Sequence, residues 1–252
     1  MKKQISLLAC LVFISFNITL AQEFEPINNF VGFGLQYGID IPAGDLADRY
    51  GTSFHVTPSV EFYNSKLNGM YGLEASIQFG SNVNEDVLES IRSSSGAILG
   101  FNGGIADVFL RRRGLYIGAF ANKTIFKTKR NPASGLNLGI GAGLFQHEVR
   151  LLDDTASATQ LRSDYAKGYD RLTRGPALKQ SINYLNIGLN RSVNYSIGLS
   201  IIEGFTESVR LINFDTQQSA KGSRLDILIS LEAKWIIPLR KTGGIGADEI
   251  YY

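Results

Sequence analysis

Leu225–Leu239, with the sequence LDILISLEAKWIIPL, carries an apolar side chain at every odd position. Its even positions include Asp226, Ser230, Glu232 and Lys234. Successive side chains of a β-strand point to opposite faces, so this period of two predicts one long strand with an apolar and a charged face. In a soluble sheet the apolar face packs on a core, whereas in a transmembrane barrel it faces lipid and the charged face lines the lumen.

The same alternation recurs along the chain, in segments close to the roughly 9 to 11 residues that a tilted membrane strand needs. Apolar residues at alternate positions predict outward faces in 31–41, 54–62, 71–79, 136–144, 185–189 and 195–201. The 27 glycines, 15 phenylalanines and 11 tyrosines are typical of closed all-β architectures. No long apolar run follows the N-terminal segment, which excludes a helical membrane protein.

The number of strands follows from a parity argument. Ile98–Arg113 and Leu115–Phe126 both look extended, which gives nine strands, and an odd number would place the two chain ends on opposite sides of the membrane. Ile98–Arg113 ends in three consecutive arginines, and one arginine on the lipid face costs roughly 2 to 4 kcal/mol at mid-bilayer. We therefore expect this segment to be an outer-loop extension that leads into the strand Leu115–Phe126, whose facing is ambiguous because Lys123 shares the parity of its apolar residues.

The connections differ in length in the way that a membrane imposes. Short links are expected at Lys66–Gly69 and Arg191–Val193, and long polar ones at Asn82–Gly104, Asp153–Pro176 and Asn213–Gly222. Outer-membrane barrels have short periplasmic turns and long outer loops. The sequence therefore predicts an all-β fold, an eight-stranded antiparallel transmembrane barrel in the outer membrane.

The N-terminus has the pattern of a cleavable signal peptide, residues 1–21, which implies export. Lys2 and Lys3 precede an apolar run over Ile5–Phe16, and Ala21 is the expected cleavage site. The predicted domains are this signal peptide, a barrel over residues 22–240 and a periplasmic tail over residues 241–252.

Composition excludes several classes of function. Cys10 would leave with the signal peptide, so the mature chain would have no disulfide, thiol catalyst or cysteine metal site. The net charge of +2 and the lack of a basic stripe interleaved with aromatics argue against nucleic-acid binding. We expect no cofactor and no metal site.

Several charged residues are predicted to face the lumen. They are Glu61, Glu74, Asp226, Glu232 and Lys234. Because side chains just fill the interior of an eight-stranded barrel, we expect a polar network that closes the lumen, with a proton or ion path as the alternative.

Two regions are candidates for outside contacts. Arg111, Arg112 and Arg113 could bind lipopolysaccharide phosphates through their guanidinium groups, or form the solvated base of a loop. Tyr165 and Tyr169 lie in a long loop of mixed charge that suits contact with a partner. The tail 241–252 could dock on an envelope protein, or it could be a frayed terminus.

The two histidines, His55 and His147, are both expected to point inward. Each could be the base of an outer-membrane lipid hydrolase. We favour a role in the lumen network, because no nucleophile motif accompanies either histidine.

Three stretches resemble the small OmpA/OmpX-type outer-membrane barrels, and more closely the barrel families abundant in Bacteroidota. They are Ile41–Tyr50, Lys167–Leu172 and Asp248–Tyr252. The resemblance implies insertion by the barrel-assembly machinery and supplies no catalytic residue. Such barrels usually finish at an aromatic residue that closes the last strand, whereas this chain continues over Arg240–Tyr252.

The sequence thus favours a non-enzymatic integral outer-membrane protein that presents loops or joins an envelope complex. The alternatives are a lipid-modifying enzyme and an exported soluble lipocalin-like binding protein.

Overall fold

The computed structural model describes residues 29–101, 103–129, 131–153, 157–158, 161, 163–188 and 193–241. The predicted signal peptide, residues 1–21, lies outside the described residues, as does the predicted tail after Lys241.

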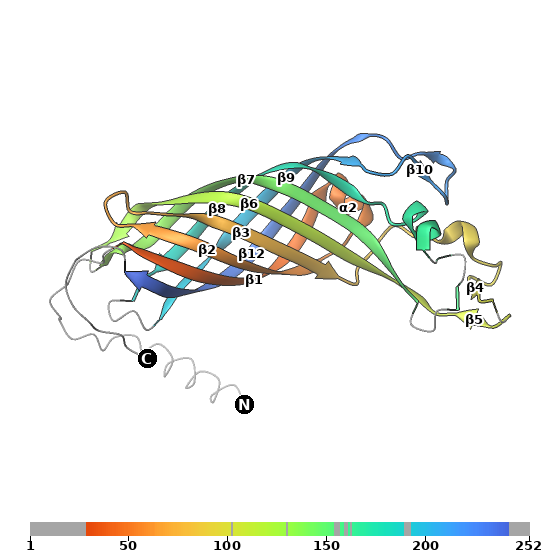
Figure 1. The fold of residues 1–252 in the computed structure, drawn as a ribbon, viewed down its shortest axis with the longest axis horizontal. Helices are drawn as coiled ribbons and strands as arrows, with labels where there is room; N and C mark the ends of the chain where they lie inside the picture. Colours follow the sequence, from red (N-terminus) through yellow and green to blue (C-terminus); the bar gives the residue numbers. More distant parts are fainter. Residues whose placement is uncertain are drawn as a thin grey trace, which may run out of the picture.

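Eight antiparallel strands form a closed barrel, as the sequence predicts (Figure 1). The strands are β1 (Phe30–Gly44), β2 (Ser53–Asn64), β3 (Gly69–Gly80), β6 (Val108–Thr128), β7 (Asn131–Asp153), β8 (Thr173–Asn186), β9 (Asn194–Ser208) and β12 (Ser223–Lys241). Their order around the ring is β1-β12-β9-β8-β7-β6-β3-β2. The stretch Leu225–Leu239 lies in β12, which closes the ring by pairing with β1, from Phe30 opposite Lys241 to Gly44 opposite Asp226.

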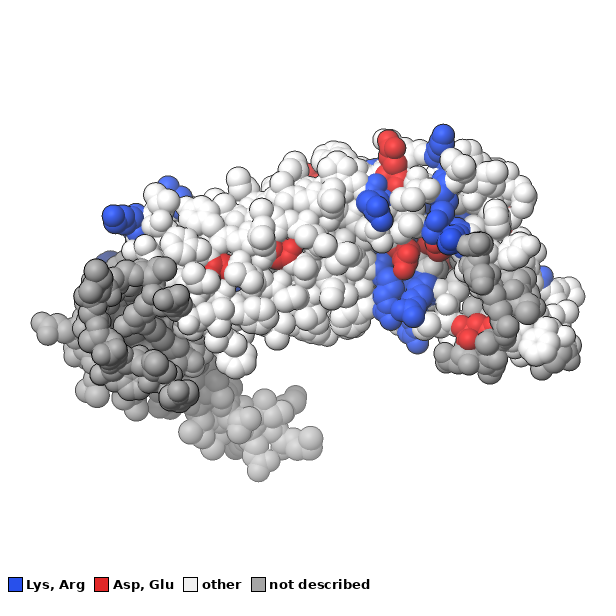
Figure 2. All heavy atoms as spheres, in the orientation of Figure 1, with Lys and Arg blue, Asp and Glu red and all other residues white. Residues whose placement is uncertain are grey.

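The alternation of β12 separates an exposed face from a buried one. Leu231 and Trp235 are 56% and 58% exposed, whereas Ser230 and Glu232 are 2% and 9% exposed. The same division continues around the ring, so an apolar belt covers the outside of the barrel. Figure 2 shows few charged side chains over the middle of the barrel. An exterior richer in apolar groups than the interior is the reverse of a soluble sheet and is the arrangement of a transmembrane barrel.

The long connections all lie at one end of the barrel, together with the short elements that they contain (Figure 1). These are α2 (Asp45–Arg49), η1 (Glu89–Ile91), β4 (Ile98–Leu99), β5 (Ile105–Ala106), η3 (Ser163–Gly168), β10 (Ile212–Asn213) and β11 (Gln218–Ser219). The connections from β2 to β3, β6 to β7 and β8 to β9, at the other end, are short in sequence. Within the described ranges, no helix is long and apolar enough to cross a membrane.

The chain is therefore an integral outer-membrane β-barrel, with its long loops outside and its short turns in the periplasm. The placement of the long connections at one end and the short ones at the other confirms the pattern of loop lengths expected from the sequence. The names outer end and periplasmic end follow from it.

The segment Ile98–Arg113 is not an additional barrel strand. Its first part forms the small β4–β5 hairpin, and from Val108 onward it extends β6 beyond the apolar belt. Lys123 is exposed on the outer face of β6, close to the periplasmic end, where it is opposite Gly69 at the start of β3.

The facing predicted for one strand end is wrong. The alternation predicts that Leu185 and Ile187 face outward, but both are buried inside the barrel, and Tyr184 faces outward instead. They belong to an apolar cluster at the periplasmic end with Phe30, Tyr63, Met70, Phe120, Ala133 and Ile236. Apolar residues on the inner face therefore close this end of the barrel. Because the inner face is apolar here, the sequence alternation does not show which face of the strand points inward.

Glycines on the inner face leave room for large side chains. A Cβ atom on Gly118 would overlap the hydroxyl of Tyr116, and one on Gly139 would overlap the side-chain amide of Asn122. The glycine content thus allows aromatic and amide groups to fill a narrow lumen.

Candidate functional site: the lumen and the outer loop cap

Two lysine–glutamate pairs occupy the middle of the lumen. Lys179 Nζ lies 2.8 Å from Glu74 Oε1, and Lys234 Nζ lies 3.0 Å from Glu61 Oε2. Lys234 Nζ also lies 4.7 Å from the centre of the Phe120 ring, a cation–π contact. All four charged groups are buried, so each partner compensates a charge that would otherwise be costly inside the barrel.

Glu232 lines the same cavity as Lys179 and Lys234 and bonds to the next layer of the lumen. It accepts a 2.7 Å hydrogen bond from Gln36 Nε2 and another of 2.7 Å from Ser200 Oγ. The five predicted lumen residues, Glu61, Glu74, Asp226, Glu232 and Lys234, thus all lie on the inner face. Asp226 takes part in a separate cluster nearer the outer end.

His55 is held between a carboxylate and an amide. Its Nδ1 lies 2.7 Å from Asp40 Oδ1, and its Nε2 lies 3.3 Å from Gln36 Nε2. Ser230 Oγ donates to the same Asp40 oxygen at 2.6 Å. A catalytic serine would have to contact the histidine, but here the serine contacts the aspartate.

His147 is held in a similar way nearer the outer end. Its Nε2 lies 2.8 Å from Asp226 Oδ2, to which Thr206 Oγ1 also donates. The hydroxyl of Tyr50 lies 3.4 Å from His147 Nδ1. The ring is fully buried, so a substrate from the membrane or from water has no access to it.

Little space remains inside the barrel. A cavity lined by Glu74, Lys179, Glu232 and Lys234 holds about 20 Å³, room for about one water molecule. A second hollow next to His55 has no such space. The described side chains therefore leave no wide passage through these layers of the lumen.

The structure separates the three arginines that the sequence grouped together. Arg112 points inward and is fully buried, with Nη1 2.8 Å from Ser53 Oγ and the guanidinium carbon 5.1 Å from the centre of the Tyr50 ring. The prediction that Arg112 contacts lipopolysaccharide or a partner is wrong. Successive side chains of a strand point to opposite faces, so Arg112 points into the lumen while its two neighbours point outward. Arg111 and Arg113 are partly exposed on the outside of β6.

The two loop tyrosines also differ. Tyr165 is 66% exposed, whereas Tyr169 is buried, with its ring edge-on to Phe214 at 5.9 Å between centroids. The prediction of a surface contact is therefore wrong for Tyr169, which packs among the outer loops.

Four side chains link all four outer loops, and we call them the loop clamp: Arg49, Glu85, Arg171 and Asp215. Arg171 donates from Nε to Glu85 Oε1 at 2.7 Å and from Nη1 to Asp215 Oδ1 at 2.9 Å. Arg49 Nε lies 3.1 Å from the second oxygen of Glu85. Burial opposes the charge of Arg171, but hydrogen bonds to Asp215 and Glu85 raise its pKa above the ordinary value.

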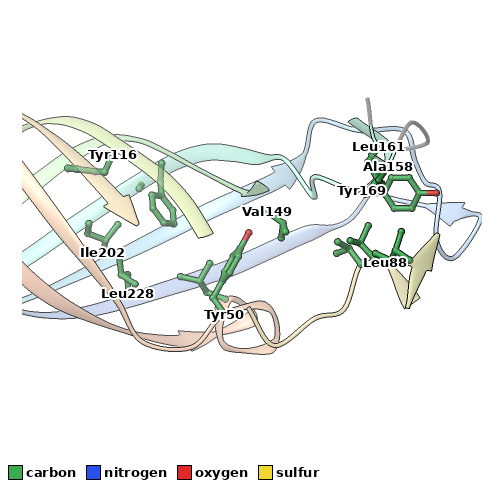
Figure 3. Packing of buried hydrophobic residues seen from close by; sticks show 14 of the residues in the cluster. Tyr50, Leu88, Tyr116, Val149, Ala158, Leu161, Tyr169, Ile202 and Leu228 are labelled. Atoms are coloured by element: carbon green, nitrogen blue, oxygen red, sulfur yellow. The ribbon is translucent and has the colours of Figure 1, made fainter. Parts of the chain in front are cut away.

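An apolar cluster supports the clamp. It runs from Tyr116, Ile202 and Leu228 inside the barrel to Leu88 and Tyr169 in the loops (Figure 3). The outer loops and the outer end of the barrel thus share one continuous core, which orders the loops over the barrel. We call these ordered outer loops the loop cap.

No local sequence pattern predicts the loop clamp. Arg171 lies in a loop of mixed charge, but Glu85 and Asp215 lie far from it in sequence, in two other loops. Only the left-handed backbone of Arg171, with φ of 50°, marks a special position, and it becomes visible only in the structure. In the part of the chain that the structure describes, no group of three or more metal-ligating side chains could hold a metal ion.

Comparisons with known proteins give weak similarities. Ail, the attachment invasion locus protein of Yersinia pestis, in complex with the heparin analogue sucrose octasulfate, aligns with a TM-score of 0.43 and 11% identity, over 84% of this chain and 100% of that chain. Another Ail structure gives 0.41 and 9% over the same shares, and the outer membrane protein OprG from Pseudomonas aeruginosa gives 0.37 and 10% over 86% and 99%. No protein-family model and no curated protein sequence matches the chain. Similarity at this level gives no information on function.

Breaking one buried pair should destabilise the barrel. Lys179→Met leaves the Glu74 carboxylate unpaired inside the lumen and should lower the free energy of unfolding by about 3 to 5 kcal/mol. Replacing both partners, as in Glu74→Leu with Lys179→Met, should recover most of that loss. Urea unfolding from lipid vesicles measures both effects, with Lys221→Met in an exposed loop as the control. Equal stability of Lys179→Met and Lys221→Met would show that the pair is not buried as described.

The filled lumen should not conduct ions steadily. In planar-bilayer recordings the purified protein should give no porin-type steps, because side chains occupy the layers between the two ends. Steady large conductance from the intact protein is the result that contradicts a closed lumen.

Proposed function

We propose that this protein is a non-enzymatic outer-membrane barrel whose filled lumen carries an ordered cap of outer loops for interaction at the cell surface. The observation that carries the proposal is the loop clamp, which joins all four outer loops through Arg49, Glu85, Arg171 and Asp215. Fixing loop backbone costs roughly 1 to 2 kcal/mol per residue. A barrel that served only as a membrane plug would not need long loops held in one arrangement, whereas ordered loops on a rigid scaffold suit recognition.

The β4–β5 hairpin is the part of the cap best suited to contact a partner. Phe101 and Ile105 are 70% and 73% exposed, and Leu99 is also exposed, although the hairpin lies beyond the apolar belt. The backbone N–H of Phe101 donates to the carbonyl of Ser157 at 2.9 Å, which ties the hairpin to the next outer loop. Exposed apolar side chains on an ordered, water-facing loop favour a protein-interaction site. Tyr165 is a further exposed aromatic residue of the cap.

Outer-membrane lipids are the second expected class of partner. Arg111 and Arg113 lie on the outside of β6 just beyond the apolar belt, and the exposed Arg150 of β7 is directly opposite Arg111. Figure 2 shows basic side chains gathered where the belt meets the loop end. Guanidinium groups at this level suit lipopolysaccharide phosphates, although Glu148 opposite Arg113 reduces the positive charge.

Other partners are suggested by the resemblance to small OmpA/OmpX-type and Bacteroidota barrels. It implies that the barrel-assembly machinery inserts the chain. The tail 241–252 would then lie in the periplasm, where it could join an envelope complex.

The surroundings of the histidines support a non-enzymatic role. His55 and His147 each have hydrogen-bonding groups at both ring nitrogens, and both rings are buried. Neither is next to a serine that it could activate, among the contacts of the described residues. These contacts suit a stabilising role in the lumen network.

A photo-crosslinking residue at Phe101 tests the proposal in intact cells. We expect it to capture a protein partner in the wild-type background. In Arg171→Met the yield should fall several-fold, because removal of the clamp releases two acidic partners and loosens the cap.

Arg92→Met is the matched control, since Arg92 pairs with Asp86 within a single outer loop and its side chain is 31% exposed, against 3% for Arg171. It should leave the crosslinking yield unchanged, as exposed ion pairs contribute only about 0 to 1 kcal/mol. No captured protein at Phe101 or Ile105 in cells that display the folded barrel would contradict the proposed function.

A further inference from the structure

The periplasmic end of the barrel carries charge of one sign on one side. Lys66 in the β2–β3 turn, Lys123 and Lys127 on β6 and Lys129 after β6 are all exposed. We call these four residues the lysine rim. No acidic residue occurs in the adjoining stretches 64–69 and 122–131. Figure 2 shows basic side chains at this end of the barrel.

The lysine rim lies at the depth of lipid headgroups. Lys123 is opposite Leu138, an exposed residue of the apolar belt, so it marks the edge of that belt. Lys127 lies four residues further toward the periplasm, roughly 13 Å along a strand and roughly 9 Å along the membrane normal at the usual tilt. The headgroup layer is about 5 to 8 Å thick on each side of the bilayer. The rim therefore extends through the whole of that layer.

Apolar side chains alternate with the lysines. Leu67, Ile125 and Phe126 are all exposed, and Phe126 is 69% exposed. Apolar and aromatic groups beside lysines are typical of side chains anchored at a membrane boundary, where the stem contacts acyl chains and the ammonium group reaches the headgroups. This mixture fits a lipid better than it fits a purely acidic peptide in water.

We propose that the lysine rim binds the phosphate groups of anionic phospholipids in the inner leaflet of the outer membrane. The proposal goes beyond the loop cap, because it concerns the opposite end of the barrel. The proposal predicts that anionic lipids are enriched around the side of the barrel formed by β2, β3, β6 and β7. The charge attraction that drives this enrichment is screened by salt. A competing occupant is the chain's own tail, which contains Asp248 and Glu249.

Quenching of tryptophan by brominated lipids measures the preference directly. Trp235→Phe removes the single tryptophan, after which Phe126→Trp places a reporter in the rim. Ile41→Trp in the same background places one on the lipid face near the outer end of β1. The full mature chain is reconstituted in phosphatidylcholine vesicles with brominated phosphatidylglycerol or brominated phosphatidylcholine.

At position 126 we expect the ratio of lipid affinities, phosphatidylglycerol over phosphatidylcholine, to be about five, and at position 41 to be about one. A factor of about five corresponds to the attraction between one lysine and one anionic headgroup. With all four rim lysines present, the affinity ratio at position 126 should fall toward one at about 0.5 M salt, because salt screens the attraction. Replacing all four rim lysines with glutamine should remove it, whereas Lys221→Gln in an outer loop should not. The salt titration keeps the test independent of whether the fourfold variant folds.

Three results would overturn the proposal. The first is equal quenching by the two lipids at position 126, and the second is a preference that salt does not change. The third is a preference that appears only after deletion of residues 243–252, since the tail and not lipid would then occupy the rim.

Discussion

Closure of the β1–β12 edge is the constraint on which the rest of the structure depends. Lipid offers no hydrogen-bond partner to an open strand edge, so every backbone group within the bilayer must be paired inside the protein. Pairing of Phe30 with Lys241 through Gly44 with Asp226 removes the last free edge. The alternation in Leu225–Leu239 follows from the same closure, because a closed strand has one face toward lipid and the other toward the lumen.

A closed ring of eight strands leaves a narrow interior, and this decides the chemistry inside. Charges on the inner face are out of bulk water, and most of them therefore lie beside an opposite charge or a hydrogen-bonding group. Lys179 with Glu74, Lys234 with Glu61, His55 with Asp40, and His147 with Asp226 are such pairs. Arg112 is satisfied only in part, by Ser53 Oγ and the Tyr50 ring, because its Nε and Nη2 have no hydrogen-bond partner. The inner glycines and the apolar cluster at the periplasmic end complete the filling. The same packing that fills the lumen makes the barrel a rigid support for the loop cap.

The sequence predicts those features that depend on local periodicity. Alternation identifies the strand faces, loop length indicates the orientation, and the run of arginines excludes a ninth strand. Prediction fails where the inner face is itself apolar, as at Leu185 and Ile187, because hydrophobicity then no longer distinguishes lipid from lumen. It also fails for Arg112, which was grouped with its neighbours by charge although its parity places it inside. The loop clamp depends on pairs such as Arg171 with Asp215, between single residues in different loops, and no local pattern encodes such a contact.

The most direct test of the account is a spin-label scan of residues 225–239, one cysteine at a time, in the mature chain reconstituted in lipid vesicles. Accessibility of each label to oxygen and to a water-soluble nickel complex separates lipid from aqueous surroundings. The account predicts high oxygen accessibility at odd positions and low accessibility to both reagents at even positions, with a period of two throughout. Odd positions that are shielded from oxygen, or even positions that are open to the nickel complex along the whole strand, would contradict a lipid-facing barrel with a filled lumen.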